Sequence, residues 1–528
     1  MFVSNLVSRI SKLIAPVLLL ATTGIAQANT YYVGNLGTDS IYVGDSLADP
    51  FATIQYAINT AVSGDTIFVI ADTYSGAGNT NLDFSGKDLT LEALPYDDTT
   101  TTATIDCQGS GSGFFFTNGE SSASIVDGFT IINANESGYY GGGAFIDNSS
   151  PTFIDCTFAS NTASYGGAVY IYDASPHFTG VTFSKNSATS DGGAVYQDYY
   201  SGPTYAHCNF TSNKAVNTGG AVYLTYGSGN FFRDTFTSNK AKYGGAYFGT
   251  YYAGPSFYGG TFSKNAATYY GGAIYNLDHS DSSWYNTLIK GNTAQYGGAV
   301  FNWNNTYPFF ENVTITGNKA TSSGGATYNG DYASPYFYYS ILWNNKVGTS
   351  ESEIHDKDFT DSSYVYDCDI SGGWSRSGSG NHNTDPKFVS STDFHLQAVS
   401  PLIDAGSTNG LTLDDHDGNP RVANFYLDLG AYERPLPTAY NDSYSMSANS
   451  TLTVGKASGI LANDLANRGG TLSATLVTNP NRGTLTLKSD GSFTYRSAPG
   501  YHGTQTFTYK AKNTKGYSSP ATVKITIS

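Results

Sequence analysis

The tripeptide Gly-Gly-Ala recurs eight times along the chain, at intervals of 24 to 27 residues, and this repeat restricts the fold more than any other feature. A second pattern, an apolar residue followed three positions later by Asn, runs in phase with it. A third pattern, Pro-x-Phe or Pro-x-Tyr, lies between the two in most repeats. The repeat alanines are Ala144, Ala168, Ala194, Ala221, Ala246, Ala273, Ala299 and Ala326, and the apolar-Asn pairs run from Phe158/Asn161 to Ile341/Asn344.

Each repeat therefore contains three short β-rich segments separated by turn residues. A helical repeat would need an apolar period of 3.6 residues, which is absent, whereas Gly, Pro, Asn, Thr and Tyr suit strands and tight turns. Propeller blades need about 40 or more residues each, so this period is too short. The pattern predicts an all-β fold, a right-handed parallel β-helix, with three strands per coil and the recurring Asn stacked in a ladder.

The first 28 residues have the pattern of a secretory signal peptide. Arg9 and Lys12 precede an apolar stretch over 13–25, and Ala26-Gln27-Ala28 is a small-x-small cleavage site. No later segment is apolar enough to predict a membrane span. The sequence therefore predicts a secreted, extracellular or cell-surface protein without membrane insertion.

A helix is expected to cap the N-terminal end of the solenoid. Asp49 is the expected N-cap, Pro50 lies in the first turn and Gly64 stops the helix. Ile54, Ile58 and Val62 would share the face that lies on the first coil. With this cap, the β-helix domain is expected over residues 29–434.

The C-terminal part changes in character. Residues 435–440 contain two prolines and are expected to form a linker. Residues 441–528 contain short alternating strands at the spacing of a β-sandwich, which predicts an Ig-like domain.

The charge balance excludes some partners. Two of the 26 basic residues lie in the signal peptide, which leaves 24 basic against 42 acidic residues and a net charge of −18. A chain this acidic is not expected to bind nucleic acid or anionic membranes by charge.

Several segments resemble known families. "PFATIQYAINTAVSGDTIFV" (50–69) resembles the opening of pectate-lyase-like β-helix proteins, and the Gly-Gly-Ala and Phe-x-x-Asn repeats are similar to those of the chlamydial polymorphic outer-membrane protein family. Residues 385–406, with "DDHDGNPR" and "DLGAYE", resemble the closing segment of bacterial right-handed β-helix proteins. These resemblances imply a β-helix over roughly 31–433.

The C-terminal module resembles the cadherin-like Ig modules of large bacterial adhesins, most clearly over "GILAND" and "GTLTLKSDGSFTYR". In such modules, acidic runs after "LAND" often bind Ca²⁺. This sequence keeps Asn463 and Asp464 but continues with "LANRGG", so the resemblance does not extend to the acidic run.

Catalytic residues are sparse in the regular coils. A β-helix lyase needs a Lys or Arg base, and a glycosidase needs paired carboxylates. Over residues 144–344 the only Arg is Arg233 and no Asp-Asp pair occurs. Asp278, His279 and Asp281 form the best local group of titratable residues and are interpreted as an ordinary turn. No catalytic residue is assigned, and whether the chain is an enzyme is left open, with a non-catalytic role favoured.

One acidic loop is a candidate metal site. Asp414, Asp415 and Asp417 lie in "DDHDGNPR", and Asp-rich loops with Gly can hold Ca²⁺. The competing interpretation is that these carboxylates cap backbone amides. No cofactor other than this structural calcium is expected.

Aromatic residues form the candidate binding surface. An aromatic residue stands two positions after most of the repeat alanines, and a mostly aliphatic residue stands one position after them. Because successive side chains of a strand alternate, the aromatic row and the aliphatic row face opposite sides of the strand. The aliphatic row suits the narrow core, which leaves the rings outside as an exposed ladder for sugars or another protein. The reverse orientation is the alternative. The ladder consists of Tyr170, Tyr196, Tyr223, Phe248, Tyr275, Phe301 and Tyr328, with Ile146 at the same offset in the first repeat.

The repeat register also places two of the four cysteines. Cys156 and Cys208 both lie two residues before a repeat Phe, and Val181 occupies that position in the coil between them. Two coils separate the sulfurs by about 9–10 Å, beyond disulfide reach. They are expected to be inert core thiols.

These observations favour a non-catalytic, adhesin-like or glycan-binding protein, with the solenoid as stalk and binding surface and the sandwich as spacer. A polysaccharide or a cell-surface partner is expected. Two alternatives stay open: a polysaccharide lyase or glycoside hydrolase with its site on the irregular coils (31–140 or 345–435), and a purely structural surface component.

Overall fold

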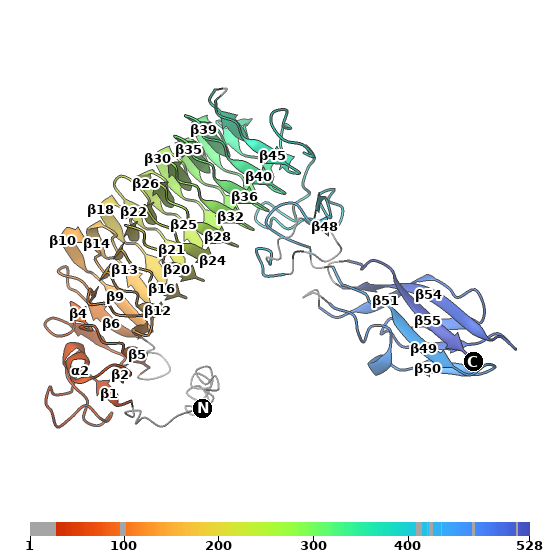
Figure 1. Ribbon diagram of the computed structural model, residues 1–528, viewed down its shortest axis with the longest axis horizontal. Helices are drawn as coiled ribbons and strands as arrows, with labels where there is room; N and C mark the ends of the chain where they lie inside the picture. The colour runs from red at the N-terminus through yellow and green to blue at the C-terminus, as the bar shows by residue number, and fades with distance from the viewer. Residues whose placement is uncertain are drawn as a thin grey trace.

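The computed structural model describes residues 28–528 apart from 96–101, 359, 408–413, 420, 422–425, 435, 467–469 and 514–515. The predicted signal peptide, except for its last residue, lies outside the described residues. Within them the chain forms a parallel β-solenoid followed by a small β-sandwich (Figure 1).

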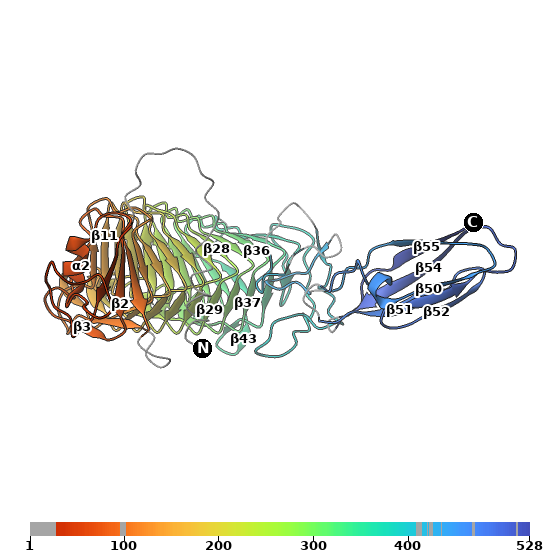
Figure 2. The same ribbon diagram turned by 90° about the horizontal axis from the view of Figure 1, so that it is seen from below.

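Four sheets run along the solenoid, and every coil of the regular part contributes one strand to each. Sheet 1 extends from β1 (Thr30–Val33) to β45 (Tyr364–Tyr366), and sheet 2 from β3 (Thr73–Ser75) to β46 (Asp369–Ile370). Sheet 3 extends from β10 (Asn135–Tyr140) to β43 (Ser350–Glu351), and sheet 4 from β4 (Leu82–Asp83) to β44 (Ile354–Asp356). All pairings are parallel except the final one, β42 (Lys346–Val347) with β43. The coils lie one behind another along the axis (Figure 2).

Four strands per coil, and not three, is a correction to the sequence interpretation. In one coil, β24 (Asn230–Phe232), β25 (Thr235–Thr237), β26 (Lys240–Tyr243) and β27 (Tyr247–Thr250) follow each other around the axis. The sheet 3 strand escaped prediction because it directly follows the ladder Asn and usually buries only an alanine, such as Ala241 in β26.

The remaining strands of the solenoid have the following bounds. The N-terminal coils contain β2 (Thr66–Ile70), β5 (Thr90–Leu94), β6 (Ala103–Asp106), β7 (Phe114–Phe116), β8 (Ile125–Asp127) and β9 (Phe129–Ile132). Sheet 1 contains β12 (Thr152–Ile154), β16 (His177–Thr179), β20 (Thr204–Ala206), β28 (Ser256–Tyr258), β32 (Ser283–Tyr285), β36 (Phe309–Glu311) and β40 (Tyr336–Tyr338). Sheet 2 contains β13 (Thr157–Ala159), β17 (Thr182–Ser184), β21 (Asn209–Thr211), β29 (Thr261–Ser263), β33 (Leu288–Lys290), β37 (Thr314–Thr316) and β41 (Ile341–Trp343). Sheet 3 contains β14 (Thr162–Tyr165), β18 (Ser187–Asp191), β22 (Lys214–Ala215), β30 (Ala266–Tyr270), β34 (Thr293–Tyr296) and β38 (Lys319–Ser323). Sheet 4 contains β11 (Ala144–Asp147), β15 (Val169–Tyr172), β19 (Val195–Asp198), β23 (Val222–Thr225), β31 (Ile274–Leu277), β35 (Val300–Trp303) and β39 (Thr327–Gly330).

The repeat register predicted the contacts between neighbouring coils. The amide of Ala194 donates to the carbonyl of Ala221 in the next coil (2.9 Å), as expected for stacked repeats. The repeat phenylalanines stack in the core, with centroids 4.7 Å apart for Phe183 and Phe210 and 4.5 Å apart for Phe210 and Phe236. These separations are close to the ~4.8 Å spacing of paired strands.

Buried asparagines form the predicted ladder. The side-chain amide of Asn186 donates to the carbonyl of Phe158 in the coil below and to the side-chain oxygen of Asn213 in the coil above (2.9 and 3.0 Å). Each amide thus bridges coils inside the core, where an unpaired polar group would be costly. The ladder contains Asn161, Asn186, Asn213, Asn239, Asn265, Asn292, Asn318 and Asn345.

Two repeat positions predicted from sequence are wrong by one residue. In the last coil Leu342 pairs with Ile315, so the apolar-Asn pair is Leu342/Asn345, and Asn344 is the left-handed turn residue before it. In the first coil Phe145 pairs with Tyr170, because "GYYGGGA" contains a third glycine that shifts the match. Ile146 therefore faces the core and is fully buried.

The N-terminal helix is shorter than expected. α2 (Ile54–Thr60) has Thr53 as its N-cap, and its buried residues are Ile54, Ala57 and Ile58. Asp49 is not the cap, because the chain stays extended through Phe51, whose amide donates to the carbonyl of Tyr32 (2.8 Å). The helix ends before Val62, which is 58% exposed and not part of the buried face.

After the last coil the chain folds back along sheet 2. Leu396, Leu402, Leu427 and Leu429 of this closing segment pack on Ile341 of β41, in a cluster separate from the main core. The segment contains one short antiparallel pair, β47 (Gly406–Ser407) with β48 (Tyr426–Leu427). It thereby covers the outer face of the last coils.

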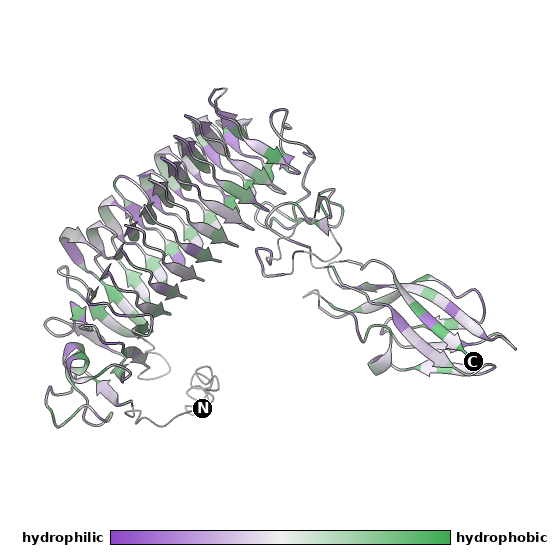
Figure 3. Ribbon diagram, viewed as in Figure 1, coloured by the Kyte–Doolittle hydropathy of each residue, from purple (hydrophilic) through white to green (hydrophobic). Residues whose placement is uncertain are grey.

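The C-terminal domain is a sandwich of two sheets. One contains β49 (Asp442–Met446), β55 (Ala521–Ile527), β54 (Gly503–Lys512) and β51 (Ser473–Thr478) in that order, and the other β50 (Thr451–Val454), β53 (Phe493–Arg496) and β52 (Thr484–Leu487). A short 3-10 helix, η1, spans Lys456–Ser458. Hydrophobic and hydrophilic residues alternate along many strands of both domains (Figure 3), as expected when neighbouring side chains face core and solvent in turn.

All four cysteines, Cys107, Cys156, Cys208 and Cys368, are buried and free. The absence of a Cys156–Cys208 bridge agrees with the predicted register. Among the described residues, no helix has the length and apolar character needed to cross a membrane.

Candidate ligand-binding surface

The predicted aromatic row lies in register along sheet 4, on the side away from the core. In β15, Val169 and Ile171 belong to the main core, whereas Tyr170 between them does not. The rings stack from coil to coil, with centroids 5.2 Å apart for Tyr170 and Tyr196 and 4.6 Å apart for Tyr196 and Tyr223. The predicted orientation of the two rows is therefore confirmed, with Phe145 in place of Ile146 in the first coil.

The expectation that this row is exposed is wrong for much of its length. Tyrosines of sheet 3 cover it from the side: the centroids of Tyr140 and Tyr170 are 4.2 Å apart, and those of Tyr270 and Phe301 are 4.5 Å apart. The exposed fractions of four rings fall to between 3% and 7%; they belong to Tyr170, Phe248, Tyr275 and Phe301. Tyr196, Tyr223 and Tyr328 are half-buried. Ligand binding by these seven residues remains a prediction, but a flat strip of free rings is not present.

Exposed rings lie instead at the next corner, in the turns that lead from sheet 4 to sheet 1. We call these six residues the tyrosine edge. Their side chains are 43% to 74% exposed. The tyrosine edge consists of Tyr199, Tyr200, Tyr226, Tyr251, Tyr252 and Tyr332.

The backbone of the tyrosine edge is left-handed throughout. Its six residues have φ between 46° and 66°, and in two coils a pair of tyrosines, Tyr199-Tyr200 and Tyr251-Tyr252, adopts this conformation in tandem. Such values are uncommon for a bulky side chain and are favoured by Gly, Asn and Asp. The two successive left-handed residues turn the chain sharply and direct both side chains outward.

Rings of the edge stack on rings of neighbouring coils. The ring centroids of Tyr172 and Tyr199 are 5.1 Å apart with planes 8° apart, and those of Tyr226 and Tyr251 are 5.4 Å apart with planes 9° apart. Tyr252 stacks on His279 of the following coil at 4.9 Å and 4°. The edge therefore presents one pair of parallel exposed rings, Tyr226 and Tyr251, and two exposed rings, Tyr199 and Tyr252, that each stack on a partly buried ring.

Carboxylates and amides lie next to these rings. Asn304 donates its side-chain amide to Asp278, and Asp281 accepts from the backbone of Tyr307 (2.6 Å). Burial raises the pKa of Asp281, and burial also raises that of Asp198. Asp278, His279 and Asp281 form part of an ordinary turn, as predicted, and carry no arrangement of a nucleophile with its base.

Three asparagines of the sheet 4 strands are buried and therefore do not belong to this surface. The side chain of Asn276 donates to Asn302 (2.9 Å) and that of Asn302 to Asn329 (2.8 Å), which makes a second ladder inside the core. Asn329 in turn donates to Asp356 (2.9 Å), which pairs with Arg376 (3.1 Å). These asparagines hold coils together and are not available to a ligand.

Sequence reasoning missed the tyrosine edge because Tyr is not a typical turn residue. Their position in the repeat could have identified them. A residue of this turn follows the first residue of each sheet 4 strand by four positions, as do Tyr199, Tyr226, Tyr251 and Asp331. That offset places them immediately past the strand end.

The candidate calcium ligands do not converge. Asp414 lies 3.8 Å from Arg233, and Asp417 lies 2.8 Å from His395. The carboxylate of Asp415 accepts from the backbone amides of Asn419 (2.6 Å) and Glu433 (2.8 Å). Among the described residues no group of three or more His, Cys, Asp or Glu side chains is placed to hold a metal ion. The arrangement favours the capping interpretation of this loop.

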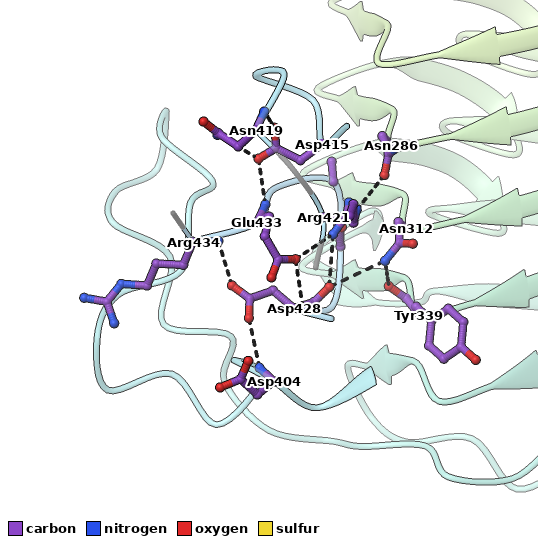
Figure 4. Close-up of polar contacts among 12 residues, drawn as sticks. Asn286, Asn312, Tyr339, Asp404, Asp415, Asn419, Arg421, Asp428, Glu433 and Arg434 are labelled. Carbon is purple, nitrogen blue, oxygen red and sulfur yellow. Dashed lines mark hydrogen bonds and ion pairs between the residues drawn. The ribbon is translucent and has the colours of Figure 1, made fainter. Parts of the chain in front are cut away.

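Asp415 belongs to a buried polar network that fixes the closing segment to the solenoid (Figure 4). The guanidinium of Arg421, 4% exposed, donates to the side chain of Asn286 (2.8 Å) and to the carbonyls of Gly430 (2.6 Å) and Asp428 (3.2 Å). Burial, aided by the charge of Asp428, raises the pKa of Glu433 to about 9. The network joins Arg421 to a turn of the regular coils and is structural.

In the sandwich, Asn463 and Asp464 of the "LAND" motif also form hydrogen bonds within the domain. Asp464 accepts from the amide of Tyr440 (2.8 Å) and from the hydroxyl of Tyr509, and Asn463 contacts the carbonyl of Asn441. Asp464 is thus engaged within the domain.

Comparisons with known proteins match parts of the chain. Residues 435–528 match the bacterial cadherin-like domain, and residues 155–172, 180–198, 259–277 and 312–330 match the Chlamydia polymorphic membrane protein repeat. No curated protein sequence matches the chain significantly.

Two solved structures are similar to this chain at low identity. A rhamnogalacturonan lyase is 12% identical over 69% of this chain and 91% of its own, with a TM-score of 0.40. The pectate lyase Pel9A is 16% identical over 78% of this chain and 98% of its own, with a TM-score of 0.35.

Proposed function

We propose that this chain is a secreted or cell-surface, adhesin-like protein that binds extended polysaccharides along the tyrosine edge without cleaving them. The observation that carries the proposal is the set of six exposed tyrosines, 43% to 74% exposed, at one corner of the solenoid. Five of them lie in three consecutive coils, and Tyr332 lies three coils further along. The match of residues 435–528 to the bacterial cadherin-like domain and the Chlamydia-type repeats support a location at or outside the cell surface.

Parallel exposed rings suit sugars because the apolar face of a pyranose stacks on an aromatic face. Carboxylates and amides beside the rings, such as Asp278 and Asn304, would take hydrogen bonds from sugar hydroxyls. Each coil offers a similar weak contact, so affinity should grow with the length of the ligand. A polymer is therefore favoured over a single sugar.

Because these tyrosines have a left-handed backbone, their rings can be removed by substitution with Asn without loss of stability. A non-Gly residue in this region costs on the order of 1–3 kcal/mol, and Asn tolerates it better than Tyr. Replacing Tyr199, Tyr200, Tyr251 and Tyr252 by Asn removes four rings without disturbing the core, since all four are exposed. The variant should melt at the same temperature as the wild type or higher.

The experiment is a glycan array of oligosaccharides of increasing length, probed with wild type and with this quadruple variant. Wild type should bind, more tightly to longer chains, and the variant should lose at least about tenfold in affinity. A matched control replaces Tyr42, Tyr440 and Tyr517, which are also exposed but lie elsewhere, by Asn. Absence of binding by wild type, or equal binding by variant and control, would overturn the proposal.

A further inference from the structure

Lysines gather at one corner of the solenoid, where sheet 2 passes into sheet 3. All eight lysines between residues 144 and 346 lie within three residues of a ladder asparagine. Seven consecutive coils each place one lysine within two residues of that asparagine. We call these seven residues the lysine column: Lys185, Lys214, Lys240, Lys264, Lys290, Lys319 and Lys346.

The strand register stacks four of these lysines in two pairs. Lys214 pairs with Lys240 and Lys319 with Lys346, so their side chains leave neighbouring coils from equivalent positions, about 4.8 Å apart. Five of the seven are exposed and two, Lys290 and Lys346, are partly buried. The other three lie just before their ladder asparagine, Lys185 and Lys264 by one residue and Lys290 by two. The column is therefore a row of positive charges along this corner, with one lysine in each of seven consecutive coils, and its members leave the backbone at three different offsets.

Little in the structure neutralises this charge. Like charges placed opposite one another in a sheet are destabilising. Within the described part of the chain none of these lysines forms an ion pair. Burial and the neighbouring Lys264 both lower the pKa of Lys290, which Asp393 partly offsets. At the far end Glu351 lies across from Lys346 in the β42–β43 pair.

A polar groove opens at the same corner. It has a volume of about 410 Å³ and is lined by Lys319 and Lys346 together with Gly317, Asn344, Gly348 and Thr349. The space beside both glycines is open, since a Cβ added at Gly317 or Gly348 would meet no atom within 4 Å. The groove lies between two stacked lysines and leaves room for a ligand beside them.

We propose that the lysine column binds a linear acidic polysaccharide, a chain carrying a carboxylate or sulfate on successive sugars. Charges repeating once per coil match a ligand whose charges repeat once per sugar, because an extended sugar unit and a coil have similar lengths. This site is separate from the tyrosine edge and does not rest on the function proposed for it.

The charge of the whole protein favours a narrow ligand. Outside the column the chain is acidic: of the 24 basic residues in 29–528, seven belong to the column, which leaves 17 basic against 42 acidic residues and a net charge of −25. Charges are screened beyond about 8–10 Å at physiological ionic strength, so a thin polymer lying on the column senses mainly the lysines. A DNA duplex or an anionic membrane is broad enough to face the acidic surroundings as well.

The test measures binding of full-length protein to three immobilised polymers. These are alginate, with a carboxylate on every sugar, hyaluronate, with a carboxylate on every second sugar, and uncharged dextran. Wild type should bind alginate more tightly than hyaluronate and should not bind dextran through the column. Raising the salt concentration should weaken alginate binding, since the contacts are electrostatic.

The variant K214Q/K240Q/K264Q should lose at least about tenfold in alginate affinity, because three adjacent charges of the column are removed. The control K456Q/K488Q/K524Q makes the same change of net charge on exposed lysines of the sandwich and should bind as wild type. Thermal melting checks that both variants are folded. The asparagine variant of the tyrosine edge should keep its alginate binding, which separates this proposal from the previous one.

The proposal is overturned if wild type does not bind alginate, if both lysine variants bind equally, or if affinity is insensitive to salt. Tighter binding to a DNA duplex than to alginate would assign the column to a different class of partner and would also overturn it.

Discussion

The side-chain oxygen of Asn213 accepts two hydrogen bonds from Asn186 of the preceding coil, one from its backbone amide and one from its side-chain amide, each 3.0 Å long. The same pair of contacts recurs between most successive members of the ladder. Both residues are fully buried, so the hydrogen bonds of their side chains depend on the coils on either side.

Replacing Asn213 by Ala should destabilise the solenoid by about 3 kcal/mol, because two buried donors of Asn186 lose their acceptor. Chemical denaturation of the purified protein measures the change. Asn230→Ala serves as control, since Asn230 is exposed at the start of β24 and should change the free energy of unfolding little. Equal effects of the two substitutions would mean that the ladder does not stabilise the fold.

The triple substitution Tyr196→Ser, Tyr223→Ser and Tyr275→Ser should lower the melting temperature strongly. These rings stack on one another or on neighbouring rings and are covered from sheet 3, so each substitution should cost about 2 kcal/mol or more. The asparagine variant of the tyrosine edge has four rings removed from the surface and is the matched comparison. If the triple serine variant melted like wild type, the covering of the row by sheet 3 would be wrong.

Stability should fall as the pH rises, partly through Glu353 at the end of the ladder. Glu353 accepts from the backbone amide of Asn345, and burial raises its pKa from 4.5 to about 8. The unfolded chain thus loses this proton at lower pH than the folded chain. The stabilisation is complete below about pH 4.5 and is lost as the pH rises through about 8.

Melting temperatures measured across this range for wild type and E353Q check the prediction. A Gln oxygen at this position can accept both hydrogen bonds from Asn345, as each ladder Asn does for the coil below, but it does not titrate. The dependence of the melting temperature on pH should therefore be shallower in E353Q than in wild type. If the melting temperatures of wild type and E353Q changed with pH in the same way, Glu353 would not contribute to the pH dependence of stability.

The cysteines should be unreactive in the folded protein. Burial raises the pKa of Cys156 and of Cys368 to about 12 and that of Cys208 well above its usual value. A thiol reagent should label none of the four cysteines under native conditions and all four in denaturant. Cys156→Val should be tolerated, because Val181 occupies the equivalent position of the next coil. Detection of a Cys156–Cys208 disulfide by mass spectrometry would contradict the coil register.

Contacts along the axis could be predicted from the sequence because they join equivalent positions of successive repeats. The repeat alone predicted that Ala194 stacks on Ala221, that the recurring asparagines form a ladder, and that Val169 and Tyr170 face opposite sides of their strand. Errors arose where the repeat itself is irregular, at Ile146 and Asn344, since one inserted or shifted residue moves the register by one.

Contacts around the axis were decided only by the tertiary structure. Whether Tyr270 covers Phe301, and whether Tyr199 and Tyr200 project into solvent, depends on how sharply the chain turns between sheets. Those turns contain one or two left-handed residues whose identity ranges over Tyr, Asp, Asn, Lys and Ser, so no residue type marks them. The sequence by itself therefore determined which residues repeat along the solenoid, and the tertiary structure determined which of those rows are covered and which reach the surface, because sideways packing depends on turn geometry that the repeat does not encode.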